Sequence, residues 1–217
     1  MTKANPNIEY RALRLDVALE EGEEEEQRKI VNGYATTFNE PYVLFEDDEE
    51  IFREQVAPNA FDNADMSDVI MQYDHEGRVF ARIRNNTLSV TPDEKGLFIE
   101  ADLGGTELGR GLYEEIRGGY TDKMSFGFTV ATDEIERTIS EDGRDEYLRS
   151  ITGINKLYDV SAVSLPANEG TSISARTLDL IDGEIERTRA ERLEAEKIEL
   201  ERRRAEVRAK AMLGGKH

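Results

Sequence analysis

Apolar and polar residues alternate with a period of two along much of the first 170 residues, which predicts β-strands. In the segment 68–76, Val69, Met71, Tyr73 and His75 share one face of the expected strand, with the histidine at its end. Residues 52–65 contain Pro-Asn and Asp-Asn pairs and predict a loop, and the polar stretch 132–150 predicts an excursion between strands. The segments expected as strands are 10–19, 29–38, 68–76, 88–91, 96–103, 123–131 and 157–167.

The period changes to about four residues between Thr106 and Gly118. Leu108, Leu112 and Ile116 recur on one helical face, Thr106 is a favourable N-cap and Gly118 a favourable end. Six or seven strands and this helix predict a mostly β (α+β) fold, a barrel or sandwich with a helix against it.

Residues 183–213 have a different composition, with Ala, Glu, Arg and Leu dominating and neither Pro nor Gly inside the segment. This composition predicts a long charged helix. We therefore expect a domain at 1–180 and a charged helical tail at 181–217. The helix is expected to be either a solvated arm or a docking element.

The formal net charge of −19 places limits on the partners. Residues 181–210 hold nine acidic and nine basic residues, so the negative excess lies in the first 180 residues. Such a body disfavours binding to nucleic acid. The acidic run 20–28 lacks the spacing of a calcium loop and is interpreted as a solvated loop joining two strands. Neither a membrane span nor a signal peptide is indicated.

The stretch MSFGF, residues 124–128, contains Ser125, a candidate functional residue between bulky apolar side chains. On a strand, Met124, Phe126 and Phe128 face one way and Ser125 and Gly127 the other, which by itself indicates only one-sided packing.

Few catalytic classes fit the histidine and cysteine content. The chain has no cysteine and two histidines, of which His217 is terminal, so a zinc enzyme is disfavoured. Serine acyl transfer with His75 as the base stays open, since histidine has an ordinary pKa of about 6.5. The G-x-S-x-G elbow of α/β-hydrolase esterases is missing around Ser125.

An ordered set of motifs carries a resemblance to a known family. The motifs are GYATTFNEPY, FREQVAPNAFD, QYDHEGRVFARI, EKGLFIEADL, GRGLYEEIRGGYTDKMSFGF and LYDVSAVSLPANEGTSISAR. Over residues 8–176 the chain resembles the prohead proteases of tailed bacteriophages, of the HK97 type. These are related in fold to the herpesvirus assemblins, so the resemblance implies a closed or partly closed β-barrel of six to seven strands surrounded by helices.

The resemblance also implies site residues. Ser125 is the implied nucleophile and His75 the general base. For the third member the herpesvirus enzymes use a second histidine, whereas the matching strand here begins with Asp159, and we select Asp159 because a carboxylate can accept the other imidazole N–H. Asp74 and Asp122 are the competitors, although Asp74 would point to the opposite strand face from His75.

An oxyanion site is implied at the backbone N–H of Ala167 or Asn168, after Pro166, although the two arginines of the viral pattern are missing there. Gly127 is expected to leave room for substrate beside Ser125.

The implied function is serine endopeptidase cleavage, without metal or organic cofactor, of the scaffolding segment of the major capsid protein and of the protease itself. The implied location is the interior of the prohead in the bacterial cytoplasm. The alternative is a non-enzymatic assembly scaffold that binds coat protein without cutting it.

Overall fold

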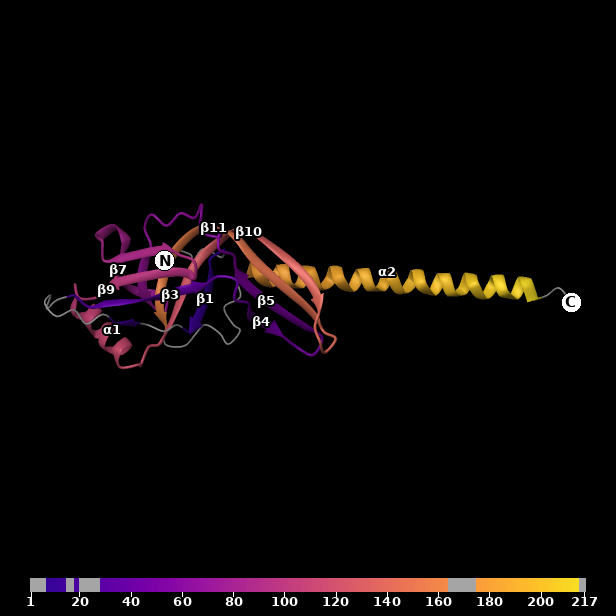
Figure 1. Cartoon of the computed structure of the whole chain (residues 1–217), viewed down its shortest axis with the longest axis horizontal. Helices are drawn as coiled ribbons and strands as arrows, with labels where there is room; N and C mark the ends of the chain where they lie inside the picture. Colours follow the sequence, from indigo (N-terminus) through magenta and orange to yellow (C-terminus); the bar gives the residue numbers. More distant parts are fainter. Residues whose placement is uncertain (1–6, 15–17, 20–27, 164–174, 215–217) are drawn as a thin grey trace. The chain divides into compact units, whose positions relative to one another are not determined.

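A computed structural model describes residues 7–14, 18–19, 28–163 and 175–214. The chain divides into two compact units, Met1–Ser174 and Ala175–His217, each described by itself. The predicted mostly β fold with a long C-terminal helix is confirmed (Figure 1). The elements are β1 Glu9–Arg14, β2 Ala18–Leu19, β3 Ile30–Thr37, β4 Tyr42–Glu46, β5 Glu50–Val56, β6 Ile70–Tyr73, β7 Glu76–Arg82, the 3-10 turn η1 Ile83–Asn85, β8 Leu88–Pro92, β9 Gly96–Asp102, α1 Glu107–Arg117, β10 Lys123–Ile139, β11 Asp145–Val163 and α2 Ala175–Gly214.

The strands form two sheets. The seven-stranded sheet has the order β1-β10-β11-β5-β4, with β6 parallel to β11 and β7 antiparallel to β6. The four-stranded sheet has the order β2-β3-β9-β8. Over the described residues neither sheet closes into the expected barrel. Because β5 and β6 pair with successive parts of the same edge of β11, the larger sheet branches instead of returning to its first strand.

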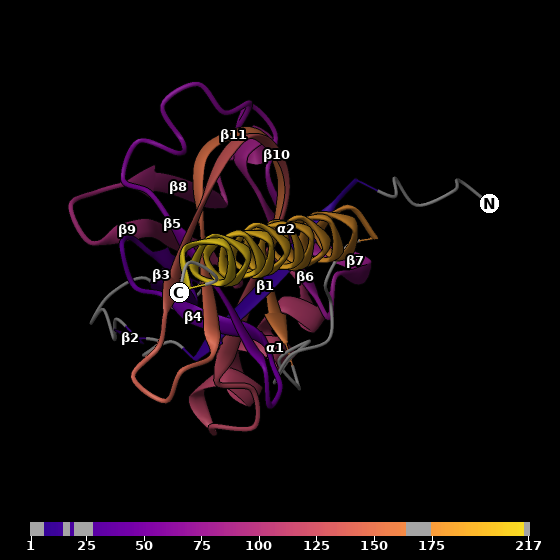
Figure 2. The same ribbon diagram turned by 90° about the vertical axis from the view of Figure 1, so that its right-hand side faces the viewer.

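The strands β10 and β11 form a long antiparallel hairpin, paired from Lys123↔Val163 to Ile139↔Asp145. Both views show them side by side (Figures 1 and 2). The expected polar excursion at 132–150 is therefore wrong. Charged residues continue the two strands because they pair across them, as Arg137 does with Asp145 at 2.8 Å.

A buried ion-pair network joins four strands of the larger sheet. Arg11 on β1 lies 2.5 Å from Glu54 on β5 and 2.7 Å from Glu9. Arg149 on β11 lies 2.9 Å from Glu9 and 2.8 Å from Glu54, and donates to Asp133 on β10 at 2.7 Å. Because each charge has opposite charges within hydrogen-bonding distance, the network can exist inside the protein and fixes these strands to one another.

Glu54 is expected to make stability depend on pH. Burial alone raises the pKa of its carboxyl, but the charge and hydrogen bonds of Arg11, then Arg149 and Tyr42, outweigh burial and lower the pKa. The folded protein therefore binds fewer protons here than the unfolded chain. This stabilisation is complete above the ordinary glutamate pKa of about 4.3 and is lost as the pH falls through the lower folded value.

Urea unfolding from pH 7 to pH 3 tests this. The free energy of unfolding should fall with acidification, and the fall should be shallower in Glu54→Gln. Equal slopes in the two proteins would contradict the assignment.

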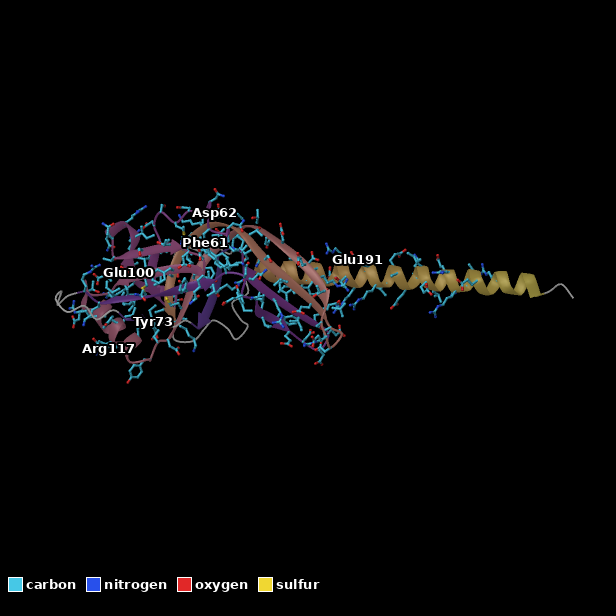
Figure 3. All side chains as sticks on the ribbon, in the orientation of Figure 1. Phe61, Asp62, Tyr73, Glu100, Arg117 and Glu191 are labelled. Atoms are coloured by element: carbon cyan, nitrogen blue, oxygen red, sulfur yellow. The ribbon has the colours of Figure 1, made fainter. Side chains whose placement is uncertain are left out.

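Glu54 also explains why the loop expected at 52–65 begins too early. Residues 52–56 belong to β5, and Phe52, Glu54 and Val56 are all buried. Because the buried Glu54 is charged, the alternation of apolar and polar residues that would predict a strand is interrupted there. The loop follows β5. Within it, Phe61 (labelled in Figure 3) is buried, with its ring centroid 6.1 Å from that of Phe38.

The expected strand 10–19 divides between the two sheets. β1 pairs with β10, whereas β2 pairs antiparallel with β3, as predicted for strands joined by the acidic run. Most of that run, residues 20–27, lies outside the described residues.

Helix α1 has the predicted N-cap, since the Thr106 hydroxyl accepts a hydrogen bond from the Gly109 N–H at 2.9 Å. Gly118 is its C-cap. Leu112 and Ile116 are buried as expected, whereas Leu108 is 50% exposed, because the buried face of the helix is formed by Gly109, Leu112, Tyr113 and Ile116.

The tail helix α2 begins at Ala175, earlier than the predicted 183. Along it, Glu184–Arg187 and Glu199–Arg203 lie at 2.7 and 3.1 Å, and Glu206 pairs with Arg202. Each pair contributes only about 0.2–0.5 kcal/mol. Within the described residues no helix is long and apolar enough to span a membrane.

Candidate active site

Strand β10 presents Ser125 and Gly127 on the face opposite the core. Met124, Phe126 and Phe128 are buried, and the rings of the two phenylalanines stack with centroids 4.7 Å apart. In the register, Ser125 lies opposite Ser161 and Gly127 opposite Asp159 on β11. Paired residues of an antiparallel ladder share a face, so these four residues lie on one side of the sheet.

His75 lies in the hairpin turn between β6 and β7, not at the end of a strand as expected. Asp74 and His75 have φ angles of 49° and 59°, the left-handed conformations that a two-residue turn requires. Tyr73, labelled in Figure 3, pairs with Glu76 across this turn. The Asp74 N–H donates to the Ala162 carbonyl at 3.0 Å, which fixes the turn to β11.

The three expected catalytic residues meet in space. His75 Nε2 lies 2.6 Å from Ser125 Oγ, and His75 Nδ1 lies 2.6 Å from Asp159 Oδ1. A carboxylate only accepts hydrogen bonds, so Nδ1 carries the proton and donates it to Asp159. Nε2 is then free of hydrogen and accepts from the Ser125 hydroxyl. The arrangement can remove a proton from a serine at neutral pH.

Ser161 is a polar contact that the sequence reasoning missed. Its hydroxyl donates to Asp159 Oδ1 at 2.7 Å, and Ser161 has no exposed surface. The same carboxylate oxygen therefore accepts from both His75 and Ser161, which restrains its rotamer. The signal was present in the sequence, since residues 159 and 161 are two apart on a strand and share a face.

Tyr10 on β1 was also missed. Its ring centroid lies 4.3 Å from that of His75, with the planes tilted by 54°. No sequence signal distinguishes this tyrosine from other strand aromatics.

Gly127 packs closely against Asp159 and Tyr10, and its expected role of leaving room for substrate stays a prediction. A Cβ on Gly127 would lie 2.5 Å from Asp159 Oδ2 and 2.7 Å from Tyr10 Cε1. The missing side chain thus admits the carboxylate and the tyrosine ring.

Gly127→Ala is expected to displace Asp159 or Tyr10 and to slow the reaction of Ser125 with a fluorophosphonate by roughly a hundredfold, because misplacing a group at a reacting centre by about 1 Å has that effect. It should also lower the free energy of unfolding by about 1–3 kcal/mol. Gly111→Ala on α1 is the matched control, since a Cβ there meets no atom within 4 Å. A normal rate of this reaction in Gly127→Ala would show that the close packing of Gly127 does not position the site.

The other sequence candidates lie apart from these contacts or outside the description. Asp74 is exposed and lies in the turn with His75, so the argument that it points to the opposite strand face does not apply. The carboxylate that His75 Nδ1 contacts is nevertheless that of Asp159. Asp122 lies 3.6 Å from Lys123. Pro166, Ala167 and Asn168 lie outside the described residues. Among the side chains that are described, no group of three or more His, Asp or Glu residues is arranged to hold a metal ion.

Comparison with known proteins shows the family to which the chain belongs. Neither the curated proteins nor the solved structures contain a match to the chain. The sequence profile described as Caudovirus prohead serine protease matches residues 15–184, which is most of the chain and includes Ser125, His75 and Asp159. The chain therefore belongs to the peptidase S78 family of Caudovirus prohead serine proteases, the enzymes of capsid maturation.

Proposed function

We propose that this serine protease cleaves peptide bonds through an acyl-enzyme, with Ser125 as nucleophile, His75 as general base and acid, and Asp159 as the residue that orients His75. The observation that carries the proposal is the pair of 2.6 Å contacts that His75 makes with Ser125 and Asp159. Asp159, itself held by Ser161, fixes the tautomer in which Nε2 can accept the serine proton.

In acylation, Ser125 Oγ attacks the scissile carbonyl carbon while its proton passes to His75 Nε2. The C–N bond then breaks, the new amine takes that proton from His75, and the acyl group stays on Ser125. Because Ser125 has no exposed surface, its side chain must be uncovered before any electrophile can reach Oγ.

In deacylation, His75 removes a proton from water, the hydroxide attacks the ester, and the proton returns to Ser125 as the acid product leaves. The backbone N–H groups of Ala167 and Asn168 stay our prediction for the oxyanion donors. One such donor typically contributes a hundredfold to a thousandfold to turnover.

A capsid protein is the substrate that the family implies. We propose the finer assignment that the scaffolding segment of the major capsid protein and the protease's own chain are cut inside the prohead, before DNA enters. In this proposal residues 1–180 form the protease domain and 181–217 a charged tail. The net charge of −19 is consistent with partners other than nucleic acid.

Co-expression with the major capsid protein tests this function. Mass spectrometry should find shortened capsid protein with the wild-type chain, and full-length capsid protein in assembled shells with Ser125→Ala. If Ser125→Ala still yields cut capsid protein, the proposed nucleophile is wrong. If neither chain cuts it, the proposed substrate is wrong.

A further inference from the structure

The Tyr10 contact with His75 comes from a part of the chain that precedes the family match. β1 ends at Arg14, and the match begins at residue 15. We propose that Tyr10 is a positioning residue, whose ring holds the His75 imidazole against Ser125 and stabilises it in its protonated form during cleavage. The proposal rests on the proposed roles of His75 and Ser125.

The register of β1 directs Tyr10 to the site. Tyr10 lies opposite Gly127, which is two residues from Ser125 on β10 and opposite Asp159 on β11, so its side chain shares the face of Ser125 and Asp159. The Tyr10 ring occupies the space that a Cβ on Gly127 would fill. The ring is therefore confined between β10 and the imidazole.

The neighbours of Tyr10 fix β1 in this register. Glu9 and Arg11 point to the opposite face and enter the buried network with Glu54 and Arg149. Glu9 and Arg11 are 1% and 4% exposed, so sliding β1 would separate buried charges. The network thus holds the tyrosine ring in place from the far side of the sheet.

The electron-rich face of the Tyr10 ring can also attract the positive charge of a protonated His75. When Ser125 gives its proton to His75, the imidazole becomes a cation within the roughly 6 Å at which an aromatic face attracts positive charge. Burial, and then the charge of Asp159, raise the pKa of Tyr10, which keeps the phenol neutral. The groups facing His75 are Asp159 on β11, Ser125 on β10 and Tyr10 on β1, with Asp74 and Glu76 beside it in the chain. Substitutions at position 10 leave the chemical identity of the other four groups unchanged.

The test measures how fast a fluorophosphonate labels the full-length chain between pH 5 and pH 9. In this reaction Ser125 Oγ bonds to phosphorus, fluoride leaves, and the serine proton goes to His75. Phenylalanine and trifluorophenylalanine at position 10 keep the ring shape but differ in the electron density of its face, and Tyr10→Leu removes the ring.

Tyr10→Phe should label within about threefold of the wild type. Trifluorophenylalanine and Tyr10→Leu should label roughly 2- to 30-fold more slowly. In both, the midpoint of the acid limb should move down by roughly half to one pH unit, because the protonated ring is less stabilised.

The outcomes separate this inference from the proposed function. Equal rates and midpoints for phenylalanine and trifluorophenylalanine overturn the stabilisation of the protonated ring, and equal rates for Tyr10→Phe and Tyr10→Leu overturn positioning by the ring. Labelling that persists in Ser125→Ala overturns the proposed nucleophile instead. Since the two phenylalanine variants have nearly the same shape, a failure of Tyr10→Leu to fold leaves the comparison intact.

Discussion

Ser125→Ala is expected to lower the rate of peptide-bond cleavage by roughly 10⁶-fold, the effect of losing the nucleophile of a serine protease. His75→Gln should cost about as much, because the two groups act as a unit. Asp159→Asn should cost roughly 10⁴-fold, since an amide can hold the wrong tautomer of His75. Cleavage of purified capsid protein, followed by gel or mass spectrometry, measures these rates.

The matched control for this series is Ser89→Ala, which makes the same chemical change at an exposed position of β8. It should cleave at the wild-type rate. Comparable losses for Ser89→Ala and Ser125→Ala would mean that the loss reflects folding and not chemistry.

Arg149→Met is expected to lower the free energy of unfolding by about 3–5 kcal/mol, the usual effect of removing one partner from a buried ion pair. Arg149 has no exposed surface, and its loss leaves Glu9, Glu54 and Asp133 with one fewer positive charge among them. Urea unfolding, followed by circular dichroism at pH 7, measures the change.

Arg144→Met provides the comparison for Arg149→Met on the same hairpin. Arg144 pairs with Glu46 and Asp142, whose side chains are about half exposed, so its loss should cost about 0–1 kcal/mol. Equal effects of the two substitutions would show that the buried network does not hold the sheet together.

Several features of the site could be predicted from sequence. Alternation alone predicted that Met124, Phe126 and Phe128 face the core while Ser125 faces away, and all three apolar side chains are buried. The selection of His75 followed from the histidine count. Only the family resemblance linked Ser125 and His75 with Asp159, because no local pattern relates residues so far apart in sequence.

The remaining features depend on tertiary contacts. Asp-His is not a typical residue pair for a two-residue hairpin turn, so the sequence does not predict a turn at Asp74 and His75. The left-handed conformation of His75 costs on the order of 1 kcal/mol. The hydrogen bond from Asp74 to Ala162 and the contact of His75 with Asp159 offset this cost. Glu54 and Arg149 occupy buried strand positions at which the alternation of apolar and polar residues predicts apolar side chains. The sequence pattern therefore predicts loops where these two strands lie. They are stable there because each finds its partner on another strand.

Mapping where a fluorophosphonate attaches tests the proposed nucleophile most directly. Tryptic cleavage after Lys123 and Arg137 yields a peptide, 124–137, in which Ser125 is the single serine. The assignment of Ser125 as nucleophile predicts the added mass on Ser125 of this peptide, and no such addition in His75→Gln. An unlabelled Ser125 in a chain that still cuts capsid protein would contradict it.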